Sequence, residues 1–124
     1  YSSRVNAYYN QGNYTQSIAY FNHALNLKPD YADAYIGRGS AYYNQGNYTQ
    51  AIADYNQALK LKPDDAGAYY NKACAYSLKK EVKEAIENLK RAIQLDVNLR
   101  ENAKTDSDFN NIRQDKQFQA LVGK

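Results

Sequence analysis

Apolar and small residues recur along this chain at helical spacing, in segments that are separated by turns. In residues 32–45, Tyr35, Gly39 and Tyr42 fall on one face of a helix. A turn follows, in which Gly46 is suited to the left-handed conformation that ends a helix. The pattern therefore predicts a helix that stops close to this glycine.

A second helix is predicted directly after the turn, over residues 49–61. Its buried face is marked by Ala51, Tyr55, Ala58 and Leu59. The helix is expected to stop before Pro63, because proline disfavours a helical conformation in the residue that precedes it. The small residues let the two helices approach closely and the tyrosines fill the space between them, so the pair is predicted to form a helical hairpin.

This hairpin occurs nearly twice, and a fixed period marks a repeat architecture. Residues 7–29 copy residues 41–63, and a looser third copy runs over residues 75–97. The first two copies differ only at Ser17/Ala51, Tyr20/Asp54, Phe21/Tyr55, His23/Gln57 and Asn26/Lys60. Their phase predicts a first helix that ends near residues 11–12, and further helices over residues 15–27, 66–79 and 82–96.

The pattern resembles the tetratricopeptide repeat family. The positions that carry the resemblance are Tyr35, Gly39, Tyr42, Ala51, Tyr55, Ala58 and Pro63. The first unit has Tyr1, Val5, Tyr8, Ser17, Phe21, Ala24 and Pro29 there, and the third has Tyr69, Ala73, Tyr76, Ala85, Leu89, Ala92 and Val97. Two departures are a bulky Val5 in place of a small residue and Val97 in place of the proline, so the last long helix is expected to run on.

The resemblance implies an all-α fold, a right-handed superhelix of three helical hairpins with a C-terminal cap. The hairpins are assigned to residues 1–31, 32–65 and 66–97, and the cap to residues 98–124. Because the chain begins inside an expected helix and without methionine, we expect it to be a fragment with more repeats upstream.

Residues 98–124 leave the repeat pattern but keep apolar positions that suit a cap. These are Leu99, Ala103, Phe109, Ile112, Phe118, Leu121 and Val122. Asp106 or Ser107 is predicted to cap a short turn, and Asp115 a last helix over residues 116–122 that Gly123 closes. The last repeat of a solenoid exposes an apolar face that such a segment covers. The segment, with N-K-A-C-A-Y-S-L at 71–78, resembles the end-of-group form of the repeat, common in bacterial proteins.

Composition and charge narrow the function. The net charge is +3 with acids and bases mixed, which is too weak to favour nucleic acid or an anionic membrane. No apolar run approaches the ~20 residues of a membrane span. The charged third unit is predicted to present a solvated outer face, with pairs such as Glu87–Arg91. Nothing indicates secretion: the Asn13 and Asn47 sequons are interpreted as turns in which Thr15 and Thr49 cap helices, so a cytoplasmic location is expected.

Candidate chemistry is sparse. The single histidine, His23, is interpreted as a surface residue, and the single cysteine, Cys74, as a small packing residue. No spacing suits zinc, and the aspartates lack the pattern of a calcium loop. The sequence therefore predicts no enzyme, no metal and no cofactor.

The helix face opposite the packing face is left for binding. It carries Asp33, Ile36, Ser40, Tyr43 and Asn44 in the second unit, Asn6, Tyr9 and Asn10 in the first, and Tyr70 and Asn71 in the third. The resemblance implies that this set lines a concave groove that binds extended or helical peptides. Tyrosine offers a large contact area, and asparagine can pair with a peptide backbone. An ordinary polar surface is the alternative interpretation.

A protein or peptide partner is thus the predicted ligand class. The family's clamp for chaperone carboxylates is argued against, since Asn6 alone matches it among Ser2, Asn6, Gly37, Gly67 and Asn71. Two other functions stay open. The chain could be a regulatory or targeting segment of a larger enzyme, or a homo-oligomerisation module that pairs through its uncapped N-terminal repeat.

Overall fold

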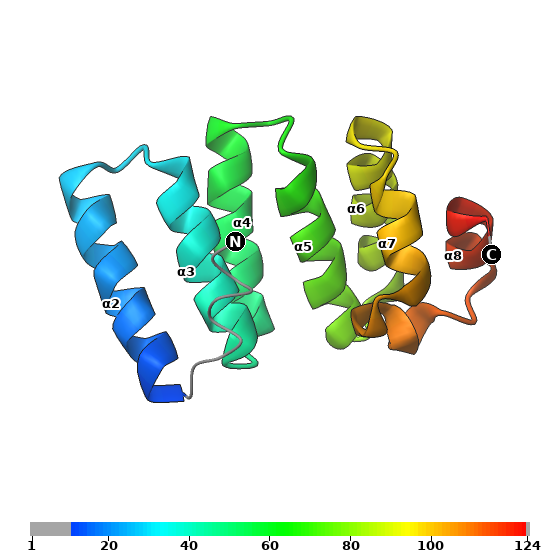
Figure 1. The fold of residues 1–124 in the computed structure, drawn as a ribbon, viewed down its shortest axis with the longest axis horizontal. Coiled ribbons are helices and arrows are strands. Elements are labelled where there is room, and N and C mark those ends of the chain that lie inside the picture. Colours follow the sequence, from blue (N-terminus) through cyan, green and yellow to red (C-terminus); the bar gives the residue numbers. More distant parts are fainter. Residues whose placement is uncertain (1–10, 124) are drawn as a thin grey trace. The chain divides into compact units, whose positions relative to one another are not determined.

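The computed structural model describes residues 11–123, which belong to two compact units, residues 1–63 and residues 64–124. In the described range every regular element is a helix, as predicted, and Figure 1 shows their order along the chain. None of these helices is long and apolar enough to cross a membrane.

The first unit contains α2 (Gln11–Leu27), α3 (Ala32–Asn44) and α4 (Tyr48–Leu61), with α3 packed against both neighbours. Figure 1 shows these three helices from blue to green. The predicted bounds of α3 and α4 are correct to within a residue. The predicted start of α2 is wrong, because the helix already includes Gln11 and Gly12. Residues 10–16 have the same sequence as residues 44–50, so the local sequence does not decide whether a turn forms.

The turn between α3 and α4 forms where predicted, with Gly46 in the left-handed conformation at a φ of 83°. The cap differs from the prediction. Asn47, and not Thr49, is the N-cap of α4, and its side-chain oxygen accepts a hydrogen bond from the Gln50 backbone N–H at 3.3 Å. The helix starts earlier than expected because Asn47 satisfies this otherwise unpaired donor.

Two glycines bring α3 close to its neighbours. At Gly39, an added Cβ would lie 2.9 Å from the ring of Tyr55 on α4, so a larger residue would force this ring to move. At Gly37, an added Cβ would overlap the ring of Phe21 on α2. Gly39 and Tyr55 are buried as the repeat pattern predicts, whereas the contact between Phe21 and Gly37 was not expected.

The second unit begins with a hairpin of α5 (Ala66–Leu78) and α6 (Val82–Leu95) and ends with three short helices. These are α7 (Leu99–Thr105), η1 (Ser107–Ile112) and α8 (Lys116–Val122). The predicted bounds of α6 are correct to within a residue, but the expectation that this helix runs on in the absence of the proline is wrong. Asp96 adopts an extended conformation, and its side chain accepts a hydrogen bond from the Asn98 N–H at 3.1 Å, so an aspartate ends this helix without a proline.

The short helices supply a core of their own, and the predicted residues form it. Phe109, Ile112, Phe118 and Val122 are buried, and Leu121 is half-buried. The predicted caps are also confirmed: Asp106 and Asp115 accept backbone N–H groups at the starts of η1 and α8, and Gly123 ends α8 in the left-handed conformation. The C-terminal segment, residues 98–124, thus lies in the same compact unit as the third hairpin. The division of the chain into three repeats stays a prediction.

Candidate functional site

The predicted binding residues of α3 fall into two groups. Asp33 is exposed, and Ile36, Tyr43 and Asn44 are half-buried. Together these four residues are called the α3 face below. Ser40 does not belong with them, because it is buried and its hydroxyl lies 3.2 Å from the hydroxyl of Tyr55. The predicted first-unit residues Asn6, Tyr9 and Asn10 lie outside the described residues.

Ser40 was expected on the open face because its position is one helical turn from Ile36 and Tyr43. The ring of Tyr55 packs against Gly39, where no side chain blocks it, and its hydroxyl therefore reaches the hydroxyl of Ser40. A buried tyrosine hydroxyl needs a hydrogen-bond partner, and Ser40 supplies it. Its role is therefore structural.

A pocket of about 390 Å³ opens beside the first part of the α3 face. Asp33 and Ile36 line it together with Ala34 on α3, Tyr20, Phe21 and Ala24 on α2, and Tyr31. Tyr20 and Phe21 meet edge to face with their centroids 5.3 Å apart, yet the side chain of Tyr20 stays 68% exposed. The pocket thus combines aromatic walls with one carboxylate at its rim.

Sequence reasoning missed the aromatic walls of this pocket. Tyr20 is one of the few positions that differ between the two near-identical copies, and its counterpart is Asp54. A large apolar residue in place of an acid was the available signal. The sequence could not predict that Tyr31 lines the pocket, because this residue lies between two helices, where helical periodicity does not apply.

The far end of the α3 face is aromatic and polar. The ring of Tyr43 meets that of Tyr48 edge to face at 5.3 Å. Beside it, the side-chain nitrogen of Asn44 is buried and makes no hydrogen bond. A buried donor without an acceptor is costly, and about 1–3 kcal/mol is the usual penalty. Because this nitrogen is buried, the cost falls on the folded chain, and the half-buried ring of Tyr43 is the group that this end of the face offers to a ligand.

In the third hairpin, the predicted binding residues are placed differently. The Tyr70 hydroxyl donates a hydrogen bond to Asp106 at 2.7 Å, and its ring packs edge to face on Phe109 at 5.6 Å. Burial and the nearby Asp106 raise the pKa of Tyr70 well above its ordinary value. Tyr70 is thus covered by the start of η1 and does not line an open groove there; its neighbour Asn71 is half-buried.

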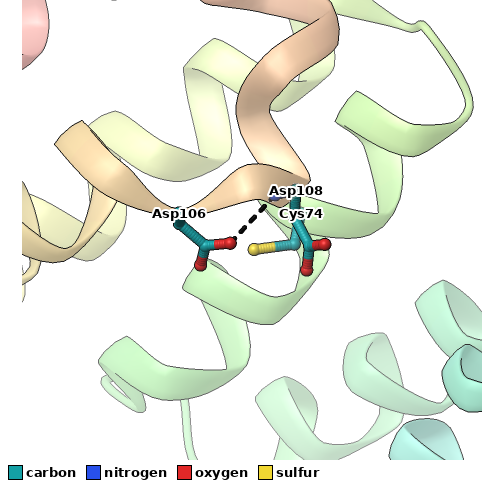
Figure 2. Close-up of side chains that lie close together, drawn as sticks. All are labelled: Cys74, Asp106 and Asp108. Atoms are coloured by element: carbon teal, nitrogen blue, oxygen red, sulfur yellow. Dashed lines mark hydrogen bonds between the residues drawn. The ribbon is translucent and has the colours of Figure 1, made fainter.

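Figure 2 shows a cluster that the sequence did not predict: Cys74 on α5 lies beside Asp106 and Asp108. One ligand atom from each residue lies within 4.8 Å of the others. Both carboxylate oxygens of Asp106 are engaged, one by the Asp108 N–H at 2.9 Å and the other by Tyr70. Cys74 is buried, as its expected packing role requires. The hydrogen bond between Tyr70 and Asp106 thus connects the start of η1 to α5.

His23 is exposed on α2, as predicted for a surface residue. A group of polar side chains in the first unit, centred on Arg38, connects neighbouring helices. Arg38 on α3 forms a two-pronged ion pair with Asp54 on α4, at 2.9 and 2.7 Å, and donates to Asn22 on α2 at 2.8 Å. Hydrogen bonding to Asp54 raises the pKa of Arg38. These side chains join α2, α3 and α4.

Comparison with known proteins identifies the class. A sequence profile of the tetratricopeptide repeat family matches residues 3–66 and again residues 37–98. The chain belongs to the tetratricopeptide repeat family, whose repeats are generally protein-interaction modules without catalytic activity. A search of curated proteins finds no match.

Among solved structures, the chain is similar to the first tetratricopeptide repeat domain of Spaghetti (RPAP3), solved with the HSP90 peptide SRMEEVD. The TM-score is 0.70, and the alignment covers 94% of this chain and 86% of that one at 24% identity. This likeness shows the fold and agrees with the predicted all-α class.

Proposed function

We propose that this chain is a non-catalytic interaction module that binds a peptide segment of a partner protein, with the α3 face in the concave groove of the repeat fold. The observation that carries the proposal is the pocket beside Asp33 and Ile36, with its three aromatic walls. Pockets that bind ligands are mostly apolar and hold a few polar groups that set orientation. The pocket has this composition.

The length of the α3 face suits an extended peptide. Ile36 and Tyr43 are seven residues apart, which is about 10 Å along a helix. About three residues of an extended chain cover this span. A side chain of the peptide would enter the pocket, and the peptide would continue along the helix to the ring of Tyr43, about three residues further on.

The similar RPAP3 domain was solved with a bound peptide, which supports a peptide as the class of ligand. The mode of recognition is expected to differ here. One position that would carry a clamp asparagine is Gly37, and the Phe21 ring covers it. We therefore expect specificity to come from aromatic contacts on α3 and not from capture of a terminal carboxylate.

Replacement of Tyr43 by alanine is expected to weaken peptide binding at least tenfold. Aromatic anchors at interfaces commonly contribute ~2 kcal/mol or more, and ~1.4 kcal/mol is a tenfold change in affinity. The measurement is calorimetric titration of the full chain with a peptide that has been selected on it from a display library. Tyr43→Phe should retain most of the affinity, and circular dichroism should show unchanged helicity in both variants.

Charge reversal on the outer helix provides the matched control for this prediction. Lys83 and Lys90 are exposed on α6, and Lys83→Glu or Lys90→Glu should change the affinity only through salt-screened attraction. If these changes abolish binding while Tyr43→Ala leaves it intact, the α3 face is not the binding site.

Self-association is a second candidate, favoured by exposed apolar side chains in the first unit. Leu27 is 75% exposed, and Tyr20 and Tyr31 are exposed nearby in the sequence. A second copy would cover such a surface. Light scattering should show a mass that rises with concentration, and Leu27→Lys with Tyr20→Lys should hold the chain at its monomer mass. A wild-type chain that stays monomeric throughout would remove this candidate.

A further inference from the structure

The two hairpins α3–α4 and α5–α6 provide an internal comparison. In the first of them, the guanidinium of Arg38 lies over the ring of Tyr35 at 5.5 Å. The same guanidinium is neutralised by the buried carboxylate of Asp54 on the following helix. This hairpin therefore combines an aromatic ring and a cation on α3 with a carboxylate on α4.

Thirty-four residues further on, the ring and the cation are kept but the carboxylate is replaced. The Lys72 ammonium lies over the Tyr69 ring at 5.7 Å, as Arg38 does over Tyr35. The residue at the position of Asp54 is Asn88. Its side-chain nitrogen donates to the backbone oxygen of Glu84 at 2.8 Å, so the amide is engaged by its own helix.

A second cation approaches the same ring. The Arg91 guanidinium lies 5.8 Å from the centre of the Tyr69 ring, and this replaces the expected pair with Glu87. Among the residues that the structure describes, neither Lys72 nor Arg91 forms an ion pair with an acidic side chain. Burial lowers the pKa of Lys72, as expected for a partly desolvated ammonium without a counterion.

We propose that Tyr69, Lys72 and Arg91 form a binding site for a carboxylate of an acidic partner segment. The bound carboxylate would neutralise these cations from outside, as the Asp54 side chain neutralises Arg38 in the preceding hairpin. Arginine and lysine both bind carboxylates through charge-assisted hydrogen bonds, and arginine can do so with two parallel bonds. The site shares no residue with the α3 face, so the two proposals stand or fall separately.

The full chain is titrated with an acetylated hexaglutamate peptide, and with hexaglutamine as the neutral control. NMR resonances of the Tyr69 ring and of the Lys72 and Arg91 side chains report the site. We expect saturable shifts with hexaglutamate alone, which weaken as salt is added because the charges are partly exposed.

Two variants test whether the site is the one proposed. Asn88→Asp installs the missing carboxylate within the chain, and Lys72→Gln removes one of the two cations. Each is expected to weaken hexaglutamate binding at least tenfold, whereas Asn88→Gln, which adds no charge, should bind as the wild type does. Asn88→Asp should also raise the melting temperature, because it would reproduce beside these cations the ion pair that Arg38 forms with Asp54 in the preceding hairpin.

The lysines outside the site separate specific binding from general attraction. Lys83→Gln and Lys90→Gln remove the same charge from the exposed face of α6. Equal weakening by these controls would mean that the peptide follows net positive charge, and the proposal would be overturned. Undiminished binding by either Asn88→Asp or Lys72→Gln would also overturn it.

Discussion

Replacement of Phe109 by alanine is expected to lower the free energy of unfolding by about 3–5 kcal/mol, the usual range for a buried phenylalanine. Phe109 is fully buried, and its ring meets those of Tyr70 and Phe118, each with a centroid distance of 5.6 Å. Its loss would leave a cavity between η1, α5 and α8. It would also uncover Tyr70, whose hydroxyl depends on Asp106 at the start of η1.

Urea unfolding followed by circular dichroism measures this loss. Val97→Ala is the matched control, since Val97 is 61% exposed and surface changes usually stay within about 0.5 kcal/mol. Deletion of residues 108–124 should destabilise the chain further, because it also removes Ile112 and Phe118. An unchanged unfolding midpoint in Phe109→Ala would show that the C-terminal segment is not a cap.

Replacement of Asp54 by alanine is expected to lower the free energy of unfolding by about 2–3 kcal/mol. The Asp54 side chain is only 6% exposed, and it is the ion-pair partner of Arg38. Loss of one partner from a buried pair costs ~3–5 kcal/mol, and the partial exposure of Arg38, 23% of its side chain, reduces that figure. The energy is lost mainly because a cation is left half-buried without its counterion.

A double-mutant cycle isolates the coupling between the two side chains. Arg38→Ala with Asp54→Ala should destabilise the chain by less than the sum of the single changes, since the double variant leaves no unpaired charge. Asp64→Ala, at an exposed position just after α4, controls for the loss of an acid as such. Additive effects of the two changes would contradict an energetic pairing of Arg38 with Asp54.

The fold class was predictable because it depends on a pattern that repeats in phase. The repeat helices are defined by small, aliphatic and aromatic residues at helical spacing, and each of the turns at Gly46 and Pro63 has a local cause. The caps at Asp106, Asp115 and Gly123 were predictable for the same reason, since capping involves neighbouring backbone groups. The bounds of α3 and α4 were accordingly correct to within a residue.

The candidate site was predictable only in part. Helical spacing placed Asp33, Ile36 and Tyr43 on one face, but it could not show that Ser40 is buried on that face. Spacing also could not show that η1 covers Tyr70, because the two segments are far apart in the sequence. The pocket needed Tyr20 and Phe21 from one helix and Ile36 from another.

The sequence by itself determined the helical hairpins, their period and the residues that cap the C-terminal segment, because these depend on contacts between near neighbours. Only the tertiary structure decided which charges are neutralised. Arg38 and Lys72 have equivalent places in two hairpins, and each lies over a tyrosine ring. A carboxylate from the following helix reaches Arg38, whereas no acidic side chain among the described residues forms an ion pair with Lys72. The difference lies in side chains that meet across two helices, and periodicity along one helix does not report it.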